Sequence, residues 1–136
     1  MQKQKASVKA FIFNSKGQLL LLWRGATAPT RPSTWDLPGG MVDDEEDLEV
    51  ALRREVFEET GLKLAKVSNF FDTRKRVTKH IWHYFLCMSS NSDIKLSYEH
   101  DRYIWQSLNS FSFDDMPKPQ IKAIKRGLKL KASSDF

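Results

Sequence analysis

Three glutamates near the end of one predicted helix, Glu55, Glu58 and Glu59, are the side chains best placed to do chemistry. Their spacing lets one helical turn direct three carboxylates toward a small volume. Glu55 and Glu59 also share an arc of the helix wheel with the apolar residues of the segment, so they are expected to face inward. Carboxylates withdrawn from water together need protons, arginines or metal ions to balance their charge. Oxygen ligands suit Mg²⁺, Mn²⁺ or Ca²⁺, and no histidine and cysteine cluster with zinc-like spacing competes.

These acids belong to a longer pattern. Gly40 is followed after five residues by Glu46, and after seven more by the run REVFEETGL at residues 54–62. The pattern matches nine fixed positions of the Nudix box over 23 residues, so the chain resembles a Nudix hydrolase. Many family members have glycine just before the first glutamate of the box, where this chain has Glu45. The box positions themselves are all intact.

The resemblance extends beyond the box. Residues 35–40, residues 99–101 and Trp105 are also similar to the family, so the resemblance covers the whole chain. It implies an α/β fold, an α/β/α sandwich in which a mixed β-sheet is packed between helices. It also implies hydrolysis of a phosphoanhydride in a nucleoside diphosphate linked to another moiety, with Mg²⁺ or Mn²⁺ as the cofactor.

The resemblance also implies roles for individual residues. Glu55 and Glu59 are the first expected metal ligands, and Glu58 is expected to be a third ligand or a proton acceptor. The backbone carbonyl of Gly39 is expected to face the metal, since glycine lets a main chain approach a ligand closely. Arg54 lies one turn before Glu58, so its guanidinium is expected to orient a carboxylate as part of the catalytic group.

Other candidates lie outside that turn. Glu99 precedes a predicted strand, where the family often supplies a further metal ligand or base, although a lone surface charge is the alternative. His100 beside it is a weaker candidate. Arg24 ends a predicted strand near the glycine turn and is a candidate for binding substrate phosphates. Trp35 is a candidate for stacking on a base, with core packing as the favoured alternative. Glu46 falls opposite the inward acids on the wheel, so its expected role is structural.

Strand and helix signals alternate along the chain. Four segments rich in β-branched, aromatic and leucine residues predict two hairpins, 7–13 with 18–24 and 67–73 with 80–88. The central helix is expected to begin near Asp47 and to end at Gly61, whose type favours a helix C-cap. A short strand is expected at 101–106. A second helix is expected from Pro117 to about residue 130, with the remaining residues frayed.

Size and composition favour one domain spanning residues 1–136, because a chain of this length buries about two-thirds of its unfolded surface in one core. No apolar run approaches the roughly 18 residues of a membrane span, and the polar start has no apolar signal region. The single cysteine, Cys87, lies in an apolar segment and suits a reducing compartment. A cytoplasmic protein without membrane association is expected, either a monomer or a homodimer.

The net charge of +5 is concentrated in the C-terminal segment. Residues 118–131 contain six lysines and arginines and no acid. The same segment has its own apolar side, which is typical of a helix that packs on the domain and exposes its charges to solvent. Nucleic-acid binding is therefore not the favoured role of this segment.

A small nucleotide is the expected substrate, and a nucleoside triphosphate cleaved to a monophosphate and pyrophosphate is the leading class. The proline found about 15 residues beyond the box in many ADP-ribose pyrophosphatases is absent, because residues 76–78 read Arg-Val-Thr. Gln120 stands near the position where relatives acting on oxidised dGTP often have an asparagine. Alternatives are an ADP-sugar, dinucleotide or coenzyme A pyrophosphatase, or a catalytically silent module that binds a nucleotide or RNA.

Overall fold

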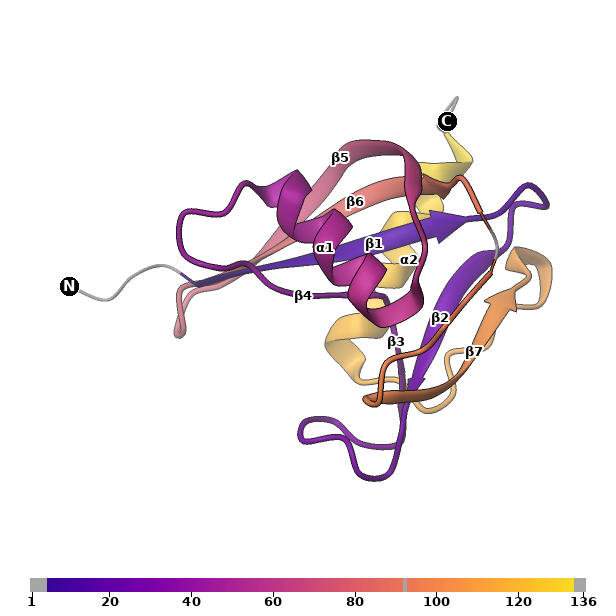
Figure 1. Cartoon of the computed structure of the whole chain (residues 1–136), viewed down its shortest axis with the longest axis horizontal. Coiled ribbons are helices and arrows are strands. Elements are labelled where there is room, and N and C mark those ends of the chain that lie inside the picture. The colour runs from indigo at the N-terminus through magenta and orange to yellow at the C-terminus, as the bar shows by residue number, and fades with distance from the viewer. Residues whose placement is uncertain (1–4, 92, 134–136) are drawn as a thin grey trace.

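The computed structural model describes residues 5–91 and 93–133, which form a mixed β-sheet with a helix on each face (Figure 1). The strands are β1 (Lys5–Phe13), β2 (Leu19–Arg24), β3 (Thr34–Asp36), β4 (Gly39–Met41), β5 (Leu64–Lys75), β6 (His80–Ser89) and β7 (His100–Gln106). The helices are α1 (Leu48–Thr60), the short 3₁₀ helix η1 (Leu108–Ser110) and α2 (Lys118–Ala132). The expected α/β/α sandwich is confirmed.

β1 occupies the centre of the sheet. It runs parallel to β6 along its whole length, from the pair Lys5↔His80 to Phe13↔Met88, and antiparallel to β4. β1 and β2 were expected to form a hairpin, but they pair only at Phe13↔Leu19, and β2 then lies between β3 and β7. The hairpin prediction is therefore confirmed only at its turn. β2 does not follow the rest of β1 because β4 pairs with that edge of β1 at Ser7, Val8 and Lys9, while β6 occupies the other edge.

Side chains of β1 alternate between two hydrophobic cores. Val8, Ala10 and Ile12 contribute to the core under α1, together with apolar residues of that helix. Phe11 and Phe13 contribute to the core under α2. Gly127 lets α2 come close to the sheet, since a Cβ there would lie 2.3 Å from the ring of Phe11. One strand therefore anchors both helices.

The second predicted hairpin is confirmed, since β5 and β6 are antiparallel neighbours. β5 begins three residues earlier and ends two residues later than the expected 67–73, which leaves residues 76–79 as the turn. The short strands β3 and β4 were not predicted. α2 reaches Ala132, so Lys131 is helical rather than frayed, and residues 134–136 lie outside the described residues.

Two further observations bear on compartment and membrane contact. Cys87 is fully buried in the core under α1, as expected, and burial raises the pKa of its thiol. No helix in the described part of the chain has the length and apolar composition needed to cross a membrane.

Candidate active site

The helix that carries the box acids is fixed at both ends. The side chain of Asp47 accepts hydrogen bonds from the backbone N–H groups of Glu49 and Val50, which caps the start of α1. Gly61 ends the helix in the left-handed conformation with φ 73°, and its N–H donates to the Phe57 carbonyl. The predicted helix ends are thus confirmed. Because the caps fix both ends of α1, they also fix the position of the turn that carries Glu55, Glu58 and Glu59.

Glu55 and Glu59 lie against the glycine pair of β4. The Gly39 N–H donates to Glu59 Oε1 at 2.7 Å. A Cβ on Gly40 would lie 2.5 Å from Glu55 Oε2, and a Cβ on Gly39 would lie 2.0 Å from the Val8 carbonyl oxygen. Gly39 also has φ 146°, which side-chain-bearing residues rarely adopt. Gly40 is therefore required for Glu55 to approach this backbone, and Gly39 is required for β4 to lie this close to β1.

Burial dominates the electrostatics of these two acids. Only 18% of the Glu55 side chain and 12% of the Glu59 side chain are exposed. Loss of water raises the pKa of Glu55, against the opposing effect of Arg54, and raises the pKa of Glu59 to about 8, against the opposing effect of Lys9. Neither carboxylate has enough positive charge nearby to offset its burial.

Arg54 connects three acids of the box. It binds Glu46 through two hydrogen bonds of 2.8 and 2.9 Å, reaches Glu55 at 3.0 Å, and contacts the more exposed carboxylate of Glu58 at 3.3 Å. The Asp43 N–H also donates to Glu46. Arg54 and this N–H lower the pKa of Glu46 to about 2. Glu46 thus holds Arg54 in place from the loop before α1, whereas Glu58 remains accessible to solvent.

Arg24 and Glu99 are brought together, and Arg24 also contacts the loop after β2. Arg24 is buried and donates to the Thr30 carbonyl at 2.8 Å, and its guanidinium lies 3.6 Å from Glu99. Thus Arg24 braces the loop after β2. The Glu99 side chain is about one-third exposed and is directed toward this arginine.

A buried ion pair beneath these residues was missed by sequence reasoning. Lys9 Nζ donates to both carboxylate oxygens of Asp36 at 3.1 Å and to the Leu37 carbonyl at 3.2 Å. Arg31 also reaches Asp36, at 3.3 Å. A lysine inside an otherwise apolar strand was the available signal, since a charge at that position requires a partner. The charge of Lys9 opposes the rise in the pKa of Glu59, whereas Asp36 adds to it.

His100 lies next to Glu59 and was the weakest candidate from the sequence. Its Nδ1 is 3.7 Å from Glu59 Oε2, and the residue is 3% exposed. Burial lowers the pKa of the imidazole, and Arg24 adds to that effect. Of residues 99 and 100, the histidine is therefore the one whose side chain adjoins the box acids.

Trp35 is half-buried and packs against the core under α2. Its ring meets the Trp23 ring edge to face at 5.1 Å, and the Arg102 guanidinium lies over both indoles, at 4.5 Å from Trp23 and 5.7 Å from Trp35. Trp23 pairs with Trp35 of β3 and with Arg102 of β7, so the three side chains form one packed cluster on the same face of the sheet. Core packing was the favoured alternative for Trp35.

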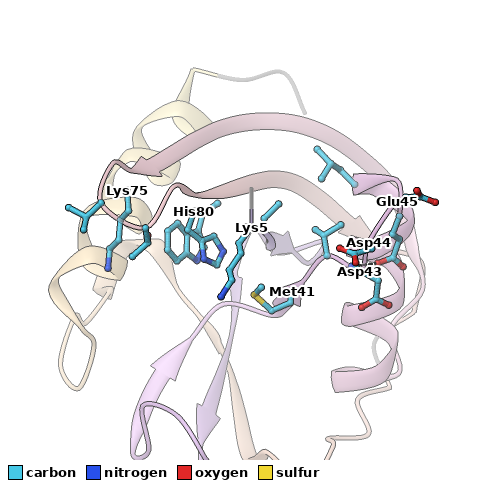
Figure 2. A pocket seen from close by; sticks show the side chains of 14 residues that line it. Lys5, Met41, Asp43, Asp44, Glu45, Lys75 and His80 are labelled. Atoms are coloured by element: carbon cyan, nitrogen blue, oxygen red, sulfur yellow. Dashed lines mark hydrogen bonds between the residues drawn. The ribbon is translucent and has the colours of Figure 1, made fainter. Parts of the chain in front are cut away.

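An open groove of about 1150 Å³ runs beside the glycine turn, between the loop that precedes α1 and the tip of the β5–β6 hairpin. Figure 2 shows Asp43, Asp44 and Glu45 on one side and Lys75 and His80 on the other. Lys5 and Met41 lie between these two walls. The two sides of the groove thus carry opposite charges. Met41, which follows Gly40, lines the groove and connects it to the glycine turn.

Within residues 5–91 and 93–133, no three side chains of His, Cys, Asp or Glu already converge as a complete metal cage. The carboxylates of Glu55 and Glu59 both lie against the Gly39–Gly40 backbone. Such a pair fits Mg²⁺, which takes one or two carboxylates and fills its other positions with water and substrate oxygens. The residues present are therefore compatible with that cation.

Comparison with known proteins agrees with this geometry. The family model described as NUDIX domain matches residues 3–127. Nucleoside triphosphatase NudI of Klebsiella pneumoniae (strain 342) is 33% identical over 107 residues, covering 69% of this chain and 76% of that protein. The MutT protein from Methanosarcina mazei Go1 has a TM-score of 0.70 at 29% identity, covering 100% of this chain and 99% of its own.

The fold is also found in a more distant structure. The NUDIX hydrolase from Nitrosomonas europaea has a TM-score of 0.79 at 19% identity, covering 98% of this chain and 75% of its own. At that identity the likeness concerns the fold alone. The match of the family model to nearly the whole chain goes further, and the predicted resemblance is confirmed: the chain belongs to the Nudix family and is a Nudix hydrolase.

Proposed function

We propose that this Nudix hydrolase cleaves a nucleoside triphosphate to a nucleoside monophosphate and pyrophosphate, using Mg²⁺ or Mn²⁺. The observation that carries the proposal is the pair of buried carboxylates, Glu55 and Glu59, held against the Gly39–Gly40 backbone without a cation sufficient to balance them. A divalent ion supplies that charge, and it would polarise phosphate oxygens and lower the pKa of bound water.

The residues of the chain divide the remaining work. Glu55 and Glu59 would hold the cation, with the Gly39 carbonyl as a further oxygen donor. Glu99 would join them only by turning away from Arg24, which lies 3.6 Å from its carboxylate in this structure. Glu58 is more exposed than its two neighbours, so its carboxylate is available to accept a proton from the attacking water or to serve as a third ligand. Arg54 restrains the orientation of both helix acids that it contacts.

The substrate class rests on similarity and on charge. NudI is named a nucleoside triphosphatase, and two cations of the groove, Lys75 on one wall and Lys5 between the walls, place positive charge near the glycine turn for an anionic substrate. Arg24 is proposed to act on phosphate groups only indirectly, because its guanidinium is buried against Thr30 and Glu99. Trp35 is proposed to remain a packing residue.

A small molecule is favoured over nucleic acid because three of the six cations of the C-terminal helix have local aromatic partners. Several of them lie over aromatic rings of the domain, namely Lys125 over Phe113 at 5.2 Å, Arg126 over Phe71 at 4.5 Å and Lys131 over Phe13 at 5.2 Å. These contacts support a role in packing α2 on the sheet. Together with the buried free Cys87, the small-nucleotide substrate supports a cytoplasmic location.

The test is a metal-dependent screen of nucleoside triphosphates, dinucleotides, ADP-sugars and coenzyme A, with product analysis. Pyrophosphate and monophosphate are expected from a nucleoside triphosphate with Mg²⁺, and no product is expected with excess chelator. Glu58→Gln and Glu59→Gln are each expected to lower kcat by about 100-fold or more. Glu49→Gln is the matched control, because Glu49 lies on the same helix and is half-exposed beside Arg53.

Three results would overturn the proposal. Hydrolysis by Glu59→Gln at the wild-type rate would exclude its carboxylate as a ligand. Binding of nucleotide or RNA without turnover across the panel would favour the catalytically silent module. Turnover confined to an ADP-sugar, a dinucleotide or coenzyme A would make that compound class the substrate in place of nucleoside triphosphates.

A further inference from the structure

His100 begins β7 and is almost completely buried, with 3% of its surface exposed. Within residues 5–91 and 93–133, neither of its ring nitrogens has a hydrogen-bond partner. A buried polar atom without a partner costs about 1–3 kcal/mol, and most such atoms in proteins are paired. An apolar side chain would fill the same space without that cost, so packing alone does not account for an imidazole here.

The nearest acid to this ring is Glu59. The two oxygens of its carboxylate have different surroundings, because Oε1 accepts a hydrogen bond from the Gly39 N–H at 2.7 Å, whereas Oε2 faces His100 Nδ1 at 3.7 Å. A hydrogen bond between nitrogen and oxygen is about 2.7–3.2 Å long. A movement of about 0.5–1 Å between these two atoms would therefore form the second hydrogen bond.

The backbone keeps the ring in this place. The Ser97 N–H donates to the carbonyl of Glu59 itself at 3.1 Å, and the Lys95 N–H donates to the Thr60 carbonyl at 2.8 Å. The His100 N–H then donates to the Ser97 carbonyl at 3.2 Å. These hydrogen bonds attach the loop before β7 to the last turn of α1. They hold the backbone of His100 close to that of Glu59, so the two side chains lie next to each other.

We infer that His100 is a positioning residue for Glu59, with its Nδ1–H donating to Glu59 Oε2 when the carboxylate binds the cation. The inference rests on the proposed function, because it takes Glu59 as a metal ligand. With the Gly39 N–H on one oxygen and the imidazole on the other, the plane of the carboxylate is fixed. Removing an outer partner of a metal ligand typically lowers metal affinity or activity by about 10- to 100-fold.

Three substitutions separate this role from packing. His100→Asn keeps a donor near the position of Nδ1, His100→Gln moves the donor toward the position of Nε2, and His100→Leu removes it. Binding of Mn²⁺ is measured by electron paramagnetic resonance without substrate, and the thermal midpoint is measured in chelator. The Leu and Gln variants are expected to bind Mn²⁺ about 10-fold more weakly, with the Asn variant within about threefold of wild type.

The direction of the stability change is the second readout. Since His100→Leu removes two unpaired buried nitrogens, its midpoint in chelator is expected to stay at the wild-type value or rise while Mn²⁺ affinity falls. Nitrogen chemical shifts of the Mg²⁺-loaded wild-type protein are expected to show His100 protonated on Nδ1. Hydrolysis of the best substrate should show a lower kcat in the Leu variant and recovery in the Asn variant.

Equal Mn²⁺ affinity in the Leu variant and the wild type would overturn the inference, as would a proton on Nε2 alone. Loss of affinity in all three variants, in parallel with their thermal midpoints, would also overturn it and assign a packing role. The wild type separates the two proposals. If it binds Mn²⁺ and hydrolyses a nucleotide while the variants match it, only the inference on His100 fails; if it does neither, both fail.

Discussion

The guanidinium of Arg54 and the carboxylate of Glu46 form two parallel hydrogen bonds, Nε to Oε2 at 2.8 Å and Nη2 to Oε1 at 2.9 Å. The remaining nitrogen, Nη1, serves Glu55 and Glu58. One acid in a loop therefore orients the arginine, and the arginine divides its remaining contacts between two acids of the helix. A lysine could not reproduce this fork.

The Glu46 pair predicts a specific stability change in acid. The folded-state pKa of Glu46 is about 2, below its ordinary value of 4.5, so its stabilising effect is complete above pH 4.5 and is lost as the pH falls toward 2. Wild type should therefore lose free energy of unfolding relative to Glu46→Gln over that window. Urea titrations at several pH values between 6 and 2.5 measure the difference, and parallel curves for the two proteins would contradict it.

Glu59 predicts the opposite dependence in metal-free protein. Its folded-state pKa of about 8 lies above the ordinary 4.5, so folding is favoured while the group is protonated, and that advantage is lost as the pH rises from 4.5 through 8. In chelator at pH 9, Glu59→Gln should be more stable than wild type by on the order of 3 kcal/mol. Chemical denaturation at pH 5 and pH 9 tests this. A wild-type advantage at pH 9 in chelator would show that the carboxylate is not destabilising.

Gly39→Ala is expected to destabilise the protein severely. The added Cβ would meet the Val8 carbonyl oxygen at 2.0 Å, and the backbone at φ 146° disfavours any side chain. A loss of about 3 kcal/mol or more in the free energy of unfolding is expected. Gly17→Ala is the control, because Gly17 has φ 73° and no atom within 4 Å of its Cβ position. It should cost only about 1 kcal/mol, and equal losses in the two variants would be inconsistent with the clash.

Lys9→Met is expected to leave Asp36 with a buried charge that lacks its closest partner, at a cost of about 3 kcal/mol. The double variant Lys9→Met with Asp36→Leu removes both charges and should recover a large part of that loss. A thermodynamic cycle of the two single variants and the double variant measures the coupling. Additive losses would mean that Lys9 and Asp36 do not stabilise each other, despite the 3.1 Å contacts.

Local signals predicted α1 and its acids well. The caps Asp47 and Gly61 and the inward arc of Glu55 and Glu59 all follow from residue type and helical period, which depend on neighbours along the chain. The pairing of β5 with β6 was predictable for the same reason, since a short turn joins them. These features require no knowledge of distant segments.

Long-range partners could not be predicted in the same way. Burial of β1 on both faces is visible only as an apolar run, and nothing in that run selects β6 rather than β2 as its main neighbour. The contact between His100 and Glu59 also joins segments about 40 residues apart, through loop hydrogen bonds that have no sequence pattern. A charge inside an apolar segment, such as Lys9, is a sequence signal that indicates a buried partner elsewhere in the chain.

The parallel pairing of β1 with β6 also has a consequence for the order of folding. During synthesis, one edge of β1 has no partner until the chain has grown by about 75 further residues, the separation between Lys5 and His80. The glycine strand β4 can join the other edge much earlier. Contacts of such separation slow folding, and a strand edge left open is prone to pair with other chains. The nascent protein is therefore most prone to aggregate after β4 has paired with β1 and before β6 has been synthesised.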